Sequence, residues 1–139
     1  MKRTTFFFTS IFAGAVSLAA LGIGASVDMP STLMSPAVYE QLKDEIEADT
    51  RLAMGNCRLA QGLEREVCRA EARSAERVKK AELYARYHGT VSAQDEIRLA
   101  HARAAYDVAK ARCGAHSGDA RYTCLRAARA EQATRLVQS

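Results

Sequence analysis

Two segments with the same cysteine spacing constrain the fold of this chain more than any other feature. Each has ten residues between its cysteines: one runs from Cys57 to Cys68 and the other from Cys113 to Cys124. Each carries a glycine at its sixth position and an arginine at its ninth, and the sequence has no further cysteine. Both segments lie between stretches of helical periodicity, so they are predicted to be elbows at which one helix ends and the next returns.

Four cysteines can pair in three ways, and the choice depends on whether the chain turns inside each segment. In a continuous helix, the two cysteines of one segment would share a face about 16 Å apart, beyond the reach of a direct bridge. Two such antiparallel helices would instead support the crossed pairing, Cys57–Cys124 and Cys68–Cys113.

The intervening residues favour the local pairing, Cys57–Cys68 and Cys113–Cys124. The second segment has four residues that break or cap helices: Gly114, Ser117, Gly118 and Asp119. The first segment has a weaker break at Gln61-Gly62. Each local bridge would close a loop of about a dozen residues and stabilise the fold by about 3 kcal/mol.

The N-terminus has the pattern of a secretory signal peptide. Met1-Lys2-Arg3 precedes an apolar run that ends in small residues near position 25, so residues 1–25 are predicted to be removed on export. An uncleaved anchor is the alternative, because about 20 apolar residues can span a bilayer. After cleavage no integral membrane segment is expected. Four cysteines in an exported chain indicate disulfides in an oxidising compartment, and we expect the periplasm.

Removing the leader changes the composition that bears on function. All four Phe lie in the leader and there is no Trp, so alanine supplies most apolar positions of the mature chain and its core is thin. Without Lys2 and Arg3, 18 basic residues remain against 16 acidic ones, a net charge of about +2. This small excess is weak evidence for nucleic-acid binding, and no nucleic-acid partner is expected.

Four helices are predicted after a flexible tail at 26–35. The first runs from about 36 to 58, because Ser35-Pro36 combines a capping residue with a proline at the first helical position. The second runs from about 65 to 88. The third begins near Ser92, where Ser-x-x-Asp is a helix start signal, and the fourth begins near Asp119.

These helices predict an all-α fold. Two disulfide-clasped helical hairpins would pack as an antiparallel four-helix bundle; two hairpins that meet loosely, or a dimer that completes the core, are alternatives. A shift of 56 residues superimposes the cysteines and aligns Gly62 with Gly118. The helical domain at 36–139 is therefore predicted to contain two repeats, about 36–88 and 92–138.

Residues that could carry catalysis or bind a metal form no recognised pattern. There is no Cys-x-x-Cys, and the cysteines are too widely spaced for the ligand clusters of a zinc site. His88 and His101 have no second histidine one turn away, and acidic residues early in helices are explained by the helix dipole. We expect no enzyme, no catalytic residue, no cofactor and no metal.

The arginines of the last helix are the one candidate binding surface. They could form a basic face for lipopolysaccharide or an anionic membrane: Arg121, Arg126, Arg129 and Arg135. The alternative is that they face the acidic first helix, which would lie beside the last helix in a closed bundle.

The pattern as a whole resembles a known group of proteins. Its elements are Ile46-Glu47-Ala48-Asp49, the two cysteine segments, Ala81-Glu82-Leu83 with Tyr87, and Ala105-Tyr106-Asp107-Val108-Ala109-Lys110. Over about residues 39–130 they resemble small, exported, Ala/Lys/Arg-rich proteins of Gram-negative bacteria, chiefly betaproteobacteria. The resemblance implies location and repeat architecture, and it transfers no activity.

We therefore expect a non-catalytic periplasmic or envelope protein. It would be a structural or protein-interaction module that binds an unidentified protein partner or associates with itself. The alternative function is binding of anionic envelope surfaces through the arginine-rich last helix.

Overall fold

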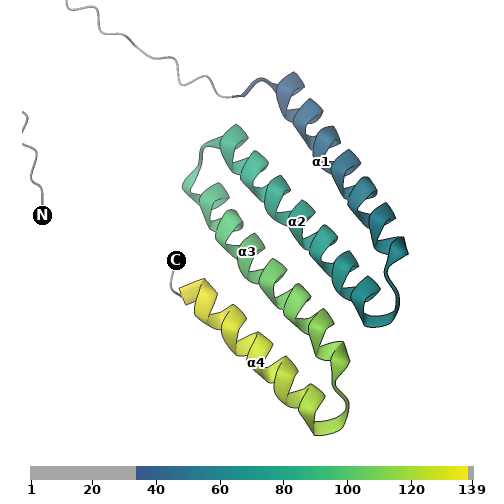
Figure 1. Ribbon diagram of the computed structural model, residues 1–139. Coiled ribbons are helices and arrows are strands. Elements are labelled where there is room, and N and C mark those ends of the chain that lie inside the picture. Colours follow the sequence, from purple (N-terminus) through teal and green to yellow (C-terminus); the bar gives the residue numbers. More distant parts are fainter. Residues whose placement is uncertain (1–33, 138–139) are drawn as a thin grey trace, which may run out of the picture. The chain divides into compact units, whose positions relative to one another are not determined.

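The computed structural model describes residues 34–137, which form four α-helices and two single 3₁₀ turns (Figure 1). The α-helices are α1 (Pro36–Asn56), α2 (Gly62–His88), α3 (Val91–Arg112) and α4 (Gly118–Val137). The 3₁₀ turns η1 (Cys57–Leu59) and η2 (Cys113–Ala115) follow α1 and α3. The all-α prediction is confirmed. The predicted signal peptide at 1–25 and nearly all of the tail at 26–35 lie outside the described residues.

The elbows are local, as predicted. Disulfides join Cys57 to Cys68 and Cys113 to Cys124, with Cα atoms 5.6 and 5.7 Å apart. After each 3₁₀ turn the chain extends briefly, and the next helix then begins at a glycine: Gly62 with φ of +51° or Gly118 with φ of +54°. Side chains rarely tolerate this left-handed conformation, so the glycine at the sixth position of each segment has a structural reason.

Two helix starts differ from the prediction: α2 begins at Gly62, three residues before the expected start, and α3 has a different capping residue. The hydroxyl of Thr90, and not that of Ser92, caps α3 by accepting a hydrogen bond from the Ala93 N–H at 3.2 Å. Gly89 ends α2 in a left-handed conformation and donates its N–H to the Ala85 carbonyl. Because the stop signal and the next cap are adjacent residues, the connection between α2 and α3 is shorter than expected.

The helices pack in the order of the chain. α2 and α3 make the most extensive contact, α1 packs against α2, and α4 packs against α3. α1 and α4 therefore flank the central pair on opposite sides, and both elbows lie at the same end of the helices (Figure 1). The expectation that the last helix packs beside the acidic first helix is wrong, and the two broad faces of the α2–α3 pair stay uncovered by this part of the chain.

The core is thin and consists mainly of alanine. Among residues 34–137, nine apolar residues are buried and six of them are alanines; the largest is Leu83, which is 1% exposed. Cys57 and Cys113, one from each disulfide, are also fully buried. Alanine allows close helix approach but buries little apolar area. The two disulfides therefore contribute a large part of the stability of the elbows.

The central helices are buried on two sides. The hydroxyl of Ser74 donates to the Ala104 carbonyl of α3 at 3.3 Å, which places Ser74 on the α3 side of α2. Leu83 is nine residues later, about 180° around the helix, and so lies on the side that packs against α1. Ala102 is related in the same way to Ala100 in α3, and both are buried.

Two glycine substitutions test the elbow geometry. Gly62→Ala should lower the free energy of unfolding by about 1 kcal/mol, because alanine is strained at positive φ. Gly55→Ala should raise it by about 0.5–1 kcal/mol, because Gly55 is helical and a Cβ there would meet no atom within 4 Å. Urea unfolding of the oxidised protein measures both changes. Shifts in the same direction would contradict the assigned conformations.

Candidate functional site

A groove on one face of the α2–α3 pair gathers basic residues from three helices. Its volume is about 710 Å³. Arg73 and Arg77 of α2, Lys110 of α3 and Arg121 of α4 line it, and we call it the cationic groove. The other lining residues are apolar or small, with two carboxylates: Leu63, Glu66, Ala70, Ser74, Asp107, Ala111, Gly114 and Leu125.

Most of the positive charge in the cationic groove is not neutralised. Arg77 Nη1 lies 2.6 Å from Asp107 Oδ2, and this ion pair joins α2 to α3. Within residues 34–137, no carboxylate forms an ion pair with Arg73, Lys110 or Arg121. Three cations therefore remain against the single carboxylate of Glu66, and the groove should attract anions.

A second groove of about 550 Å³ has a different character. Its floor consists of alanine and valine, with Ala75 and Val78 from α2 and Ala105 and Val108 from α3, and we call it the alanine groove. Polar and charged side chains surround this floor: Lys79, His101, Arg112, Glu131 and Arg135. Ala105 is two positions, about 200° around the helix, from Asp107 in the cationic groove, so the two grooves occupy opposite faces.

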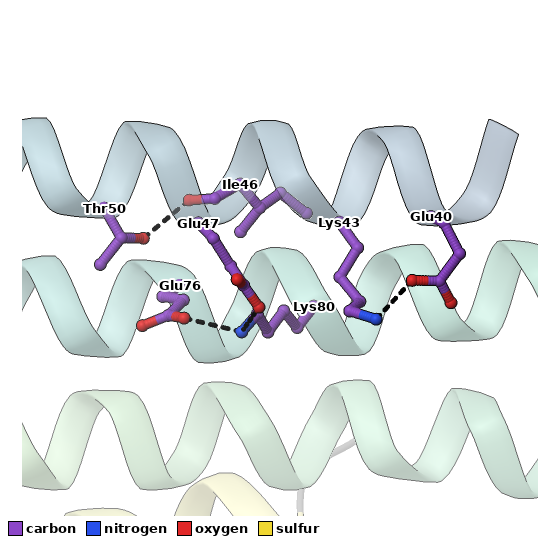
Figure 2. A network of polar contacts seen from close by, with 7 residues as sticks. All are labelled: Glu40, Lys43, Ile46, Glu47, Thr50, Glu76 and Lys80. Atoms are coloured by element: carbon purple, nitrogen blue, oxygen red, sulfur yellow. Dashed lines mark hydrogen bonds and ion pairs between the residues drawn. The ribbon is translucent and has the colours of Figure 1, made fainter. Parts of the chain in front are cut away.

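Polar contacts between α1 and α2 use the acidic residues of α1. Lys80 Nζ donates to Glu47 Oε1 of α1 and is also 2.8 Å from Glu76 Oε1 of its own helix (Figure 2). One residue earlier, Lys79 Nζ lies 3.1 Å from Asp49 Oδ2. Lysines of α2 therefore pair with the acidic stretch of α1 that was expected to face the arginines of the last helix.

These contacts shift the pKa values of both partners. Hydrogen bonds to Glu47 and then Glu76 raise the pKa of Lys80 above its ordinary value of 10.5. The hydrogen bond from Lys80 lowers the pKa of Glu47 below 4.5. Both side chains are more than one-third exposed, so the ion pair contributes more to the register of α1 on α2 than to stability.

The four arginines of the last helix do not form one surface. Arg121 lines the cationic groove, whereas Arg135 lines the alanine groove on the opposite face and pairs with Glu131 Oε1 at 2.7 Å. The Arg126 guanidinium carbon is 6.0 Å from the centroid of the Tyr122 ring.

Arg129 is directed to the neighbouring helix. Its hydrogen bond with Tyr106 of α3 raises the pKa of Arg129. This contact helps to join α3 to α4, whose buried residue is the small Ala128.

The basic residues of the other helices were missed at the sequence level. Arg73 and Arg77 are four residues apart and so share one side of α2, a spacing that could have indicated a common surface. Lys110 and Arg121 are separated by the second elbow, and only the fold-back of α4 on α3 brings them to one groove.

Two of the three histidines of the described part of the chain are near other side chains. His88 packs against Tyr84 with ring centroids 4.0 Å apart, and His101 Nε2 is 3.6 Å from Glu82 Oε1. Among residues 34–137, no group of three or more His, Cys, Asp or Glu side chains has a metal-binding arrangement.

Comparison with known proteins adds no assignment. No protein-family model, curated protein or solved structure matches the chain. No helix within residues 34–137 is long and apolar enough to cross a bilayer. The two disulfides indicate an oxidising compartment outside the cytoplasm.

The pKa of Glu47 gives a test of the α1–α2 contact. Because folding lowers this pKa, the stabilisation is present above about pH 4.5 and is lost as the pH falls through the folded-state value. Glu47→Gln should therefore lower the melting temperature slightly at pH 7, and the difference from the unmodified protein should vanish in acid. Asp44→Asn is the control, since Asp44 is exposed on the same helix. The contact is contradicted if both variants follow the same pH profile.

Proposed function

We propose that this protein is a non-catalytic interaction module of the periplasm or envelope, exported by a cleaved leader. The single observation that carries the proposal is the uncovered state of both broad faces of the α2–α3 pair among the described residues. A helical layer with so little buried apolar surface is well suited to gain stability by packing against another protein.

Two features support a role outside the cytoplasm. Both cysteine pairs are oxidised within one chain, which suits a compartment that forms disulfides. The leader-like residues at 1–25 supply a route to it. The core of residues 34–137 is thin, so the fold depends on its disulfide bonds. These bonds persist in an oxidising compartment and would be reduced in the cytoplasm.

The alanine groove is the face best suited to a protein, and the occupant we propose is a second copy of this chain. Its alanine floor permits close approach of another helix, as small residues do where helices cross. Its rim carries both signs of charge, such as Lys79 and Arg112 beside Glu131. The rim has one carboxylate, so across a twofold axis Glu131 of each copy can meet Lys79 or Arg112 of the other.

Binding of a broad anionic surface through the last helix alone has less support. Such binding needs cations that project together from one face. Arg121 and Arg135 line opposite grooves, and Arg129 interacts with Tyr106.

Self-association through the alanine groove is tested by light scattering after size-exclusion chromatography. The mature oxidised protein should have twice the mass of one chain at about 100 µM, and Ala75→Arg should restore the mass of one chain, because a buried and unpaired guanidinium is costly at an interface. Ala127→Arg is the matched control, since Ala127 is an exposed alanine of α4 outside both grooves.

A one-chain mass for the unmodified protein at every concentration would overturn self-association. Equal dissociation by Ala75→Arg and Ala127→Arg would place the interface elsewhere. Circular dichroism of both variants confirms that their helices are intact.

A further inference from the structure

We propose that the cationic groove is a binding site for a small anionic amphiphile, a single alkyl chain that carries a phosphate or carboxylate head group. This inference goes beyond the interaction role, because it uses the opposite face of the α2–α3 pair and does not depend on self-association. It is based on three properties of the groove: its unpaired cations, its apolar lining and its concave shape.

The cations reach the groove from three helices. Arg73, Lys110 and Arg121 come from three different helices and line one groove, and within the described part of the chain none of them has a carboxylate partner. Arginine suits the purpose, since its planar fork can donate two hydrogen bonds to a phosphate or carboxylate. Three helices converge here because the second elbow folds α4 back on α3.

The nearby ion pair leaves these cations available. Arg77 holds Asp107 at 2.6 Å, so this carboxylate is already occupied within the groove. Glu66 is then the only other carboxylate in the lining. A bound anion would be near three positive charges and one negative charge. This excess of positive charge favours a ligand with one or two negative charges.

The lining between the cations suits an alkyl chain. Leu63 of α2 and Leu125 of α4 line the groove together with Ala70 and Ala111. The one hydroxyl there, on Ser74, already donates to the Ala104 carbonyl, so the floor presents no unsatisfied donor from this side chain. A ligand that were only polar, such as inorganic phosphate, would leave this apolar surface exposed to water.

The shape favours a single molecule over a membrane. A volume of about 710 Å³ falls in the range of roughly 300–1,000 Å³ that small-molecule sites occupy. The cations line a hollow between helices, and a flat bilayer surface cannot enter such a hollow. Binding should therefore be to the monomeric amphiphile.

Isothermal titration with dodecyl phosphate, below its critical micelle concentration and at low salt, tests the proposal. The oxidised protein should bind one molecule per chain. Dodecyl maltoside, which has the same alkyl chain without the charge, should not bind measurably. Octyl phosphate should bind roughly tenfold more weakly, because four fewer methylenes are partly buried, and inorganic phosphate should be weaker still.

Two charge-matched variants locate the site. Arg121→Gln should weaken dodecyl phosphate binding about tenfold, as expected for loss of a charge-assisted hydrogen bond. Arg126→Gln removes the same charge from the same exposed helix outside the groove and should change the affinity less than about twofold. Both residues are exposed, so neither substitution should unfold α4.

Several results would overturn the proposal. These are the absence of saturable binding, equal affinity for dodecyl maltoside, or equal weakening by the two variants. Sedimentation with anionic vesicles distinguishes binding of a single amphiphile from binding to a membrane that carries the same head groups. Vesicle binding that Arg126→Gln weakens as much as Arg121→Gln would indicate general attraction to a charged membrane and would refute a site for the monomer.

Discussion

The two disulfide elbows are the constraint on which the rest of the structure depends. Each bridge joins the end of one helix to the first turns of the next, and a glycine at positive φ lets the chain reverse between them. The alanine-rich contacts between helices bury little apolar area, so they alone would leave each helical hairpin marginal. The disulfides of the elbows reduce the conformational freedom of the unfolded chain, and this stabilises a fold whose core contributes little stability.

The order in which the helices pack determines what surfaces the protein offers. Because each helix packs on its neighbour in sequence, α2 and α3 are central and α1 and α4 are peripheral. The central pair is buried along its two sides and open on its two faces. One face concentrates cations around an apolar floor, and the other combines an alanine floor with charges of both signs. A closed four-helix bundle would have covered at least one of these faces.

Much of the fold could be predicted from the sequence because its signals are local. Ser35-Pro36 begins α1, and Gly62 and Gly118 mark the elbows, since caps, glycines and cysteine spacing act over a few residues. The side-by-side order of the helices could not be predicted, because it depends on contacts between residues far apart in the sequence. Lys79 and Asp49 are 30 positions apart, and lysines are too common on helix surfaces for such a pair to be identified in advance.

The candidate site was predictable only in part for the same reason. Arg121 was identified from the sequence. The other three basic residues of the cationic groove, Arg73, Arg77 and Lys110, lie on other helices, and only the folded chain brings them together with Arg121. The four arginines of the last helix were grouped by their nearness in sequence. Arg121 and Arg135 are seven residues before and after the buried Ala128, so they lie on either side of the part of α4 that packs on α3 and line different grooves.

Disulfide mapping tests the central claim most directly. Trypsin cleavage of the unreduced protein should place the four cysteines in four peptides, at 52–58, 66–69, 113–121 and 122–126. Mass spectrometry should then find the first joined to the second and the third joined to the fourth. A link between the peptides at 52–58 and 122–126 would show that the helices are bridged to one another, and it would contradict the local elbows from which the open helical layer and both of its grooves follow.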